Sequence, residues 1–508
     1  MIRSAALVAF AASLSGCSDG SHYLVVTVTN RPAVHAAATL RVTLSNAGST
    51  RTEELSVGAE TFPLTFSVEA PGRAGELGVT VEAVDDAGLV IGRGATQTSV
   101  EADTASVRLD TTDFVVNTDF AGDQYPSQYF DTHGMQAAAT PDGRWTVAYR
   151  DGCQVPCNML ARQFDATGQP LTTALAASTN GFAVSEDLTT SFSNIGVAAA
   201  GSTTLFAWNF RVPMSSPAVS GIACRSLDGQ GRALAEQRDL SLDASTDIVS
   251  VAPLSNNNFA VTWQGLSPLV IRSVVVRPDC TKLGSELTVS TTAGADRPHV
   301  AANGSPATIL YAWTVDGSVY LRRANATNTL QGATDTRFLP ASATEIVEFV
   351  RVAPLGTGFA VIVRWALSTG VTGPGRIEMY RTNAQGAVLG QPVTVTTRSG
   401  SDFASSESFG VASNASNDTV LVTWHSCETN GDGQGCGVFA RAFRSDGTPV
   451  GEEITVPTTT LGDQKGPSAA ALPEGFAVIW RDASGQAPDV SDSAVRARII
   501  YLDDGTSQ

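Results

Sequence analysis

Short runs of alternating apolar and polar residues follow one another along nearly the whole chain after residue 22. The first such runs are Leu24–Thr29, Leu40–Leu44, Leu64–Val68 and Leu77–Ala83. Turn sequences that contain glycine, such as residues 46–48 and 85–88, separate them. Alternation with a period of two is typical of β-strands that bury one face. Residues 22–112 are therefore predicted to form a β-sandwich.

The rest of the chain repeats a longer unit. The clearest copies are residues 251–263, 352–363 and 470–480, each of which joins two apolar strands through a turn. The last residue of the second strand marks each copy, and the seven markers are Tyr149, Trp208, Trp263, Trp313, Val363, Trp424 and Trp480. Successive markers are 59, 55, 50, 50, 61 and 56 residues apart. This spacing is about one propeller blade.

Six copies continue with two more strands, and the seventh continues with one. The third strand reads like Leu160–Phe164 or Phe439–Phe443, and a turn such as Asp165–Gly168 follows it. A fourth strand such as Glu453–Val456 completes the unit. Four antiparallel strands repeated seven times predict a seven-bladed β-propeller over residues 113–508, so the whole chain is expected to be all-β. A linear β-solenoid is the alternative, although its rungs are usually shorter.

The two ends of the repeat region complement each other. The seventh copy stops after its third strand, near Leu502, and lacks a fourth. Residues 114–118, just before the first copy, look like the fourth strand at residues 454–458. We predict that residues 114–118 pair with the last blade, because this closes the ring without an open sheet edge.

The start of the chain carries a targeting pattern. Arg3 precedes an apolar segment, Ala5–Leu14, which is about half as long as a membrane span. The segment ends in Leu14-Ser-Gly-Cys17, which resembles the lipobox of bacterial lipoproteins. The resemblance implies that residues 1–16 are a signal peptide, that Cys17 carries a diacylglycerol and an acyl chain such as palmitate, and that residues 17–21 are a lipidated tether. An ordinary secretory signal with a chance cysteine is the alternative.

This resemblance also implies a location. Two or three acyl chains anchor a protein stably, since each buried methylene contributes about 0.8 kcal/mol. Ser18, rather than an aspartate, follows the cysteine, which favours the outer membrane of the cell envelope. The β-sandwich after the tether looks like the Ig-like domains of bacterial surface proteins, which act as spacers. The chain as a whole resembles envelope lipoproteins with degenerate propeller repeats.

The net charge of the chain limits the classes of molecule that it can bind. The chain has 32 basic and 49 acidic residues, which gives a net charge of −17. Such a chain repels phosphate, and it has no basic patch, so nucleic acid is excluded as a partner. The remaining candidates are a protein and a glycan, in addition to the membrane that holds the anchor.

Six cysteines besides Cys17 are candidates for disulfides. Cys153 and Cys157 are near neighbours, as are Cys427 and Cys436, and these two pairs leave Cys224 and Cys280. Export permits disulfides, but sequence alone leaves fifteen connectivities open. Zinc is the alternative at residues 153–157, although no further Cys or His cluster completes a tetrahedral site.

No metal or cofactor is expected, with calcium as the alternative at Asn430–Gly435. Oxygen-bearing side chains alternate with glycines there, but Arg441 occupies the position at which a calcium loop needs a glutamate. The five histidines fall in no catalytic or metal motif; they are His22, His35, His133, His299 and His425. We expect His425 to lie in a loop near the propeller face.

Two recurring side chains need an interpretation. The marker aromatics are expected to pack between blades, the alternative being platforms on which sugars stack. Arginines recur in the third strands, and we expect them to contact carboxylates at the strand surface or between blades: Arg162, Arg322, Arg441 and Arg498.

The favoured function is a non-enzymatic binding or scaffolding protein, because a propeller by itself identifies no activity. Its contact face is expected in the longer variable loops, which are residues 150–158, 209–219, 365–375 and 425–437. The alternative is a hydrolase or lyase that acts on polysaccharide in the central funnel. A cluster of carboxylates in the funnel favours the enzyme, and a lining of small or apolar residues favours binding. A spacer for another protein is the third hypothesis.

Overall fold

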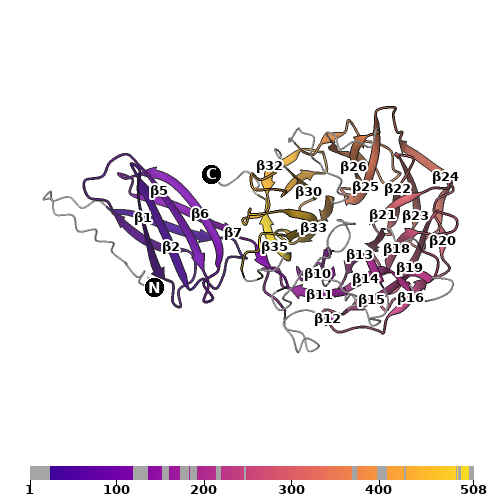
Figure 1. The fold of residues 1–508 in the computed structure, drawn as a ribbon, viewed down its shortest axis with the longest axis horizontal. Coiled ribbons are helices and arrows are strands. Elements are labelled where there is room, and N and C mark those ends of the chain that lie inside the picture. Colours follow the sequence, from indigo (N-terminus) through magenta and orange to yellow (C-terminus); the bar gives the residue numbers. More distant parts are fainter. Residues whose placement is uncertain are drawn as a thin grey trace. The chain divides into compact units, whose positions relative to one another are not determined.

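The computed structural model describes residues 23–117, 135–150, 159–171, 182–183, 191–212, 219–244, 248–368, 375–396, 409–427, 431–487, 489 and 493–502. These residues form strands, turns and connecting segments, so the chain is all-β as expected. The chain divides into two compact units, residues 1–114 and 115–508 (Figure 1). No helix among the described residues has the length and apolar character needed to cross a membrane.

The first unit contains seven strands around one apolar core. They are β1 (Tyr23–Asn30), β2 (Thr39–Asn46), β3 (Ser49–Ser56), β4 (Leu64–Glu69), β5 (Glu76–Val84), β6 (Val90–Ser99) and β7 (Thr104–Thr111). Their order is β3-β2-β5-β6-β7-β1-β4, and β1 and β7 run parallel. Alternate residues of the inner-facing strands contact the core, as Val26 and Val28 do from β1 and Val79 and Val81 from β5.

The second unit is a ring of seven four-stranded sheets, which confirms the seven-bladed propeller (Figure 1). Blade 1 contains β9 (Met135–Ala139), β10 (Trp145–Arg150), β11 (Met159–Phe164) and β12 (Phe182–Ala183). Blade 2 contains β13 (Ser191–Ala200), β14 (Thr203–Val212), β15 (Val219–Leu227) and β16 (Arg238–Ser241). Blade 3 contains β17 (Val249–Pro253), β18 (Phe259–Gln264), β19 (Ile271–Val276) and β20 (Leu287–Thr288). Blades 4 and 5 contain β21 (Asp296–Asn303), β22 (Thr308–Val315), β23 (Ser318–Asn325), β24 (Leu330–Leu339); and β25 (Glu345–Leu355), β26 (Gly358–Leu367), β27 (Arg376–Thr382), β28 (Val393–Thr394). Blades 6 and 7 contain β29 (Phe409–Asn414), β30 (Thr419–Ser426), β31 (Gly437–Arg444), β32 (Pro449–Thr455); and β33 (Gln464–Leu472), β34 (Gly475–Asp482), β35 (Ala494–Tyr501) and β8 (Phe114–Val115).

The predicted ring closure is confirmed for residues 114–117, whereas Thr118 lies outside the described residues. Strand β8 is the fourth strand of blade 7, next to β35. The Val116 amide donates to the Val495 carbonyl at 2.7 Å, and the Val495 amide donates to Asn117 Oδ1 at 2.7 Å. The Asn117 side chain in turn donates to Asp489 at 2.7 Å. The ring is thus closed by a strand that comes before the first blade in the sequence.

The marker residues pack between blades, as expected, and are not sugar platforms. Each of the seven is at most 1 % exposed. Trp263 of blade 3 shares a core with Leu205 and Ala207 of blade 2, and Trp424 of blade 6 shares one with Phe349 of blade 5. The markers of blades 2 to 7 therefore each fill the seam between their own blade and the preceding one.

The recurring arginines also lie between blades, where they bond to backbone carbonyls. Each donates to a backbone carbonyl at the end of the preceding blade's fourth strand. The pairs are Arg162 with Val116, Arg322 with Val289 at 2.5 Å, Arg441 with Val395 at 3.2 Å, and Arg498 with Val456 at 2.9 Å. Arg322 also pairs with a carboxylate, that of Asp335, at 3.4 Å. The bonds to carbonyls were not expected, and they form because the outer end of a fourth strand offers a carbonyl with no strand beyond it.

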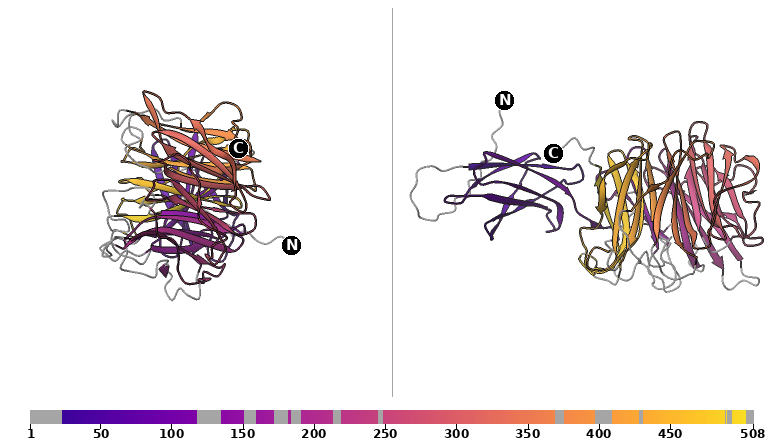
Figure 2. Two further views of the ribbon diagram at one scale, coloured as in Figure 1. Left: turned by 90° about the vertical axis from the view of Figure 1, so that its right-hand side faces the viewer. Right: turned by 90° about the horizontal axis from the view of Figure 1, so that it is seen from above.

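The two ends of the blades differ. Six turns between third and fourth strands share one hydrogen-bond pattern. In each, an Asp or Asn side-chain oxygen accepts a hydrogen bond from the backbone N–H two residues later in the sequence. These residues are Asp165, Asp228, Asp279, Asn325, Asn383 and Asp446. Connections between second and third strands lie at the opposite end of each antiparallel sheet. Each of the four long loops named from the sequence contains such a connection, although residues 209–212, 365–367 and 425–426 belong to the preceding strands. Figure 2 shows the blades from the side.

The closing strand yields a stability prediction. Val116 is fully buried, so Val116→Ala should cost about 2 kcal/mol of unfolding free energy. Val395→Ala changes the corresponding buried position of blade 5 and should cost a similar amount. Val388→Ala, at a position 47 % exposed, should change stability by less than about 0.5 kcal/mol. Urea unfolding followed by tryptophan fluorescence measures this, because all seven tryptophans lie between residues 145 and 480. A Val116→Ala protein as stable as the Val388→Ala control would contradict the closure.

Candidate functional site

The centre of the propeller holds a cavity of about 260 Å³, which we call the funnel. The first strands of all seven blades line it: β9, β13, β17, β21, β25, β29 and β33. Most lining residues are Ala, Val, Gly, Ser or Pro. The longer polar side chains among them are Gln136, His299 and Arg351. Among the described lining residues there is no Asp or Glu.

Close packing at the axis explains the small residues. A Cβ on Gly196 would lie 2.9 Å from the Val249 carbonyl oxygen of the next blade, and a Cβ on Gly410 would lie 3.0 Å from the Pro467 carbonyl oxygen. Contacts this short exclude any side chain larger than hydrogen at these two positions. The sequence therefore has glycine where neighbouring inner strands approach most closely.

The inner strands are sheet edges, so their free backbone groups need partners. Side chains of the preceding blade supply several. The Val300 amide donates to Ser250 Oγ at 3.2 Å, and the Ala137 amide donates to Ser468 Oγ at 3.3 Å. In the same way the Val352 amide donates to His299 Nδ1 at 3.2 Å. These bonds join blades around the funnel, including blades 7 and 1.

His299 and Arg351 give the funnel its polar character. Burial, together with the positive charge of Arg351, holds the pKa of His299 well below its usual value, so the imidazole is neutral. Because Nδ1 accepts a hydrogen bond, Nε2 carries the proton. The Arg351 guanidinium donates to the Val350 carbonyl at 3.1 Å and lies 5.5 Å from the centre of the Phe409 ring. The described lining thus has hydrogen-bond donors and apolar surface but no pair of carboxylates for acid–base chemistry.

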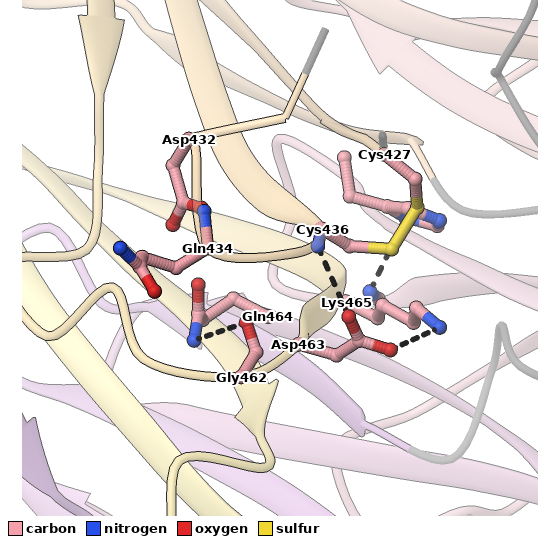
Figure 3. Close-up of a disulfide and its surroundings, with 10 residues drawn as sticks. Cys427, Asp432, Gln434, Cys436, Gly462, Asp463, Gln464 and Lys465 are labelled. Atoms are coloured by element: carbon pink, nitrogen blue, oxygen red, sulfur yellow. Dashed lines mark hydrogen bonds and ion pairs between the residues drawn. A yellow bond between two sulfur atoms is a disulfide. The ribbon is translucent and has the colours of Figure 1, made fainter. Parts of the chain in front are cut away.

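Four of the candidate cysteines form two disulfides. Cys224 in β15 of blade 2 bonds Cys280 in a turn of blade 3, and both are buried. Cys427 bonds Cys436 and closes the loop between β30 and β31 (Figure 3). Cys17, Cys153 and Cys157 lie outside the described residues.

The Cys427–Cys436 loop is held against blade 7. The Cys436 backbone amide donates to Asp463 Oδ1 at 3.0 Å (Figure 3). The Gln464 backbone amide donates to the Cys436 carbonyl at 2.7 Å. Lys465 pairs with Asp463 at 2.8 Å. The Cys436 end of this loop is thus held on the neighbouring blade.

The alternative calcium site, Asn430–Gly435, lies within the loop that the Cys427–Cys436 disulfide closes. Asn430 lies outside the described residues, and Asp432 Oδ1 accepts the Gln434 amide at 3.0 Å. Arg441 donates to the Val395 carbonyl. Over the described part of the chain, no group of three or more His, Cys, Asp or Glu residues could hold a metal ion.

The histidines differ from expectation in one respect. His425 is the second-last residue of β30 rather than a loop residue, and it is buried. Its Nδ1 faces the Gly466 amide of blade 7 at 3.5 Å. Burial, followed by the positive charges of Lys465 and Arg364, lowers the pKa of His425 to about 3, although Asp463 opposes this. His22 and His133 lie outside the described residues.

Sequence reasoning missed two of the three longer polar residues of the funnel, Gln136 and Arg351. One signal was available for Arg351, which interrupts the otherwise apolar run Phe349–Pro354 at the start of the fifth copy. Gln136 gives no such signal, since it follows a methionine in a segment with few repeat features.

Comparison with known proteins identifies no family. No protein-family model matches the chain, and no curated protein matches its sequence. Among solved structures, a six-bladed propeller lectin of the fungus Aleuria aurantia is 10 % identical, with a TM-score of 0.35 over 73 % of this chain and 95 % of the lectin. The NanB sialidase of Streptococcus pneumoniae is 9 % identical, with a TM-score of 0.42 over 92 % and 89 %. An endo-arabinase of Bacteroides thetaiotaomicron is 11 % identical, with a TM-score of 0.31 over 50 % and 92 %. At these values the similarity carries no information about ligand or activity.

The buried His425 predicts a pH dependence of stability. Its folded-state pKa of about 3 lies below the unfolded value near 6.5, so this contribution is complete above pH 6.5 and is lost as the pH falls towards 3. Between pH 7.5 and 5.5 the loss should be about 1.4 kcal/mol. His425→Gln should remove this part of the loss, because glutamine does not titrate. Urea unfolding at both pH values measures it, and an unchanged pH difference in His425→Gln would contradict the assignment.

Proposed function

We propose that the chain is a lipid-anchored protein of the bacterial cell envelope whose propeller is a non-enzymatic binding or scaffolding module. The support for the anchor is the sequence Leu14-Ser-Gly-Cys17 after an apolar segment. In this proposal residues 1–16 are removed, Cys17 carries the lipid, and Ser18 directs the protein to the outer membrane. The seven-stranded first unit is then an Ig-like spacer between the membrane and the propeller.

The lining of the funnel is the observation that carries the binding role. Glycoside cleavage by the usual route needs two carboxyl groups about 5–10 Å apart across the scissile bond. The described lining has none, and its longer polar side chains, Gln136, His299 and Arg351, can donate hydrogen bonds. A neutral imidazole and a guanidinium orient an acceptor-rich group by hydrogen bonds.

The arrangement of loops supports the same role. The short third-to-fourth turns repeat one hydrogen-bond pattern, whereas the second-to-third connections differ in length and sequence from blade to blade. Variable loops on a uniform scaffold are the usual form of a recognition face. Protein and glycan both remain candidate partners for this face.

The anchor is tested by lipid labelling. The unaltered protein expressed in a Gram-negative bacterium should incorporate radiolabelled palmitate and enter the detergent phase of Triton X-114. Cys17→Ser should remain unlabelled and enter the aqueous phase, because the sulfur that accepts the diacylglycerol is gone. Ser18→Ala keeps the cysteine and serves as the matched control, which should behave like the unaltered protein. An unlabelled parent protein would refute the lipid anchor.

The absence of catalysis is tested with polysaccharides. The full chain, incubated with plant, fungal and bacterial polysaccharides, should release neither new reducing ends nor unsaturated products above a heat-denatured control. Product formation by the folded protein would favour the hydrolase or lyase. If His299→Gln or Arg351→Met then abolished it, the reaction would belong to the funnel.

A further inference from the structure

The seam between blades 4 and 5 departs from the pattern of the other seams. At the third-strand position occupied by Arg162 in blade 1, the arginine recurs in blades 2, 4, 6 and 7, as strand pairing shows. Blade 3 has Val274 there, and its seam with blade 2 is joined by the Cys224–Cys280 disulfide. Blade 5 has Tyr380 at this position and Val363 as its marker. In the described strands, this seam therefore has neither an aromatic residue at the marker position nor an arginine at the position equivalent to Arg162.

A polar and aromatic group takes their place, which we call the seam cluster: Glu345, Trp365, Arg376, Glu378 and Tyr380. Trp365 pairs with Arg376 across the sheet, and Val363 pairs with Glu378, so these side chains share the sheet face that packs on blade 4. Trp365 lies two residues beyond the marker position, towards the end of the blade that bears the long loops.

The cluster is rigidly organised around Glu378. This carboxylate accepts hydrogen bonds from Trp365 Nε1 at 2.8 Å, from the Tyr380 hydroxyl at 2.9 Å and from Arg376 Nε at 3.0 Å. Burial raises the pKa of Glu378, but these donors outweigh it and hold the pKa below its usual value. The Arg376 guanidinium stacks on the Trp365 ring at 4.8 Å and also pairs with Glu345.

The cluster is also more open than its counterparts. Leu339 corresponds to Val116, Val289, Val395 and Val456 of other blades, which are fully buried, but Leu339 is only partly buried. The neighbouring Phe338 is partly buried as well and meets Tyr380 edge to face at 5.6 Å. The side chains of Arg376 and Glu345 are 39 % and 36 % exposed.

These observations lead to one ligand class, and we propose that the seam cluster is a binding subsite for a neutral saccharide residue. The proposal rests on the binding function proposed above and locates a ligand outside the funnel. A sugar has an apolar C–H face and vicinal hydroxyls that both donate and accept. Tyr380 and Phe338 provide aromatic surface, Arg376 provides donors and Glu345 provides acceptors. An anionic ligand meets two carboxylates here, and a cationic ligand meets the guanidinium, so a neutral ligand fits best.

The test uses saturation-transfer-difference NMR with the full chain and five uncharged probes. These are the methyl glycosides of glucose, galactose, mannose, fucose and N-acetylglucosamine. At least one probe should receive saturation, and its dissociation constant should rise about tenfold or more in Arg376→Ala and in Glu345→Gln, since each removes a charge-assisted hydrogen bond. Arg232→Ala removes an exposed ion pair in blade 2 and should leave binding within about twofold.

Each outcome has one meaning. If no probe receives saturation, or if both seam variants bind as the parent does, the proposal is overturned. In the second case, binding elsewhere leaves the broader binding function standing. Conversion of a probe to the free sugar, visible in the same spectra, would instead refute the non-enzymatic role. Thermal melting checks that the variants fold. If Arg376→Ala is unstable, Glu345→Gln alone decides whether the seam cluster binds the probe, because this change is exposed and nearly isosteric.

Discussion

Burial of apolar side chains in the seams between blades is the interaction on which the propeller depends. A single four-stranded blade has two apolar faces and cannot bury either alone. The markers solve this by filling the seams, so that Trp263 belongs as much to the core of blade 2 as to its own blade. Burying such a ring is worth several kcal/mol, which makes each seam a larger contribution than any hydrogen bond near it. Two sets of hydrogen bonds then fix how neighbouring blades are aligned. The third-strand arginines bond to carbonyls of the preceding blade, and side chains bond to backbone amides of the inner strands around the funnel.

This dependence explains which parts of the molecule can vary. The seams, the tight third-to-fourth turns and the crowded axis all restrict residue type, the last by requiring glycine at positions such as Gly196 and Gly410. The second-to-third connections differ more, from the two-residue turn Asp316–Gly317 in blade 4 to the disulfide-closed loop of blade 6. Function is therefore expected where a blade departs from the shared pattern without loss of the ring, as blade 5 does with Tyr380 and Val363.

The architecture could be predicted from the sequence because it is periodic. Seven markers at nearly equal spacing, and one orphan strand at residues 114–118, were enough to predict the blades and their closure. The partners of Arg162 and Arg498 could not be predicted, because a backbone carbonyl of another blade leaves no trace in residue type. The same holds for His425, whose burial depends on Gly466 in the next blade. The funnel residues were missed because a residue lines the funnel by its position in a first strand, and no sequence motif marks that position. The seam cluster can be recognised only when equivalent positions of the blades are compared.

The closing strand also determines how the molecule responds to mechanical load. Only Thr112 and Asp113 separate the last strand of the first unit from β8, so tension applied at the N-terminus reaches the strand that closes the ring before it reaches any other part of the propeller. The pairing of β8 with β35, together with the bonds of Val116 and Asn117, then opposes this tension. In a chain tethered at that end, a load on the propeller would therefore act first on the strand that closes the ring.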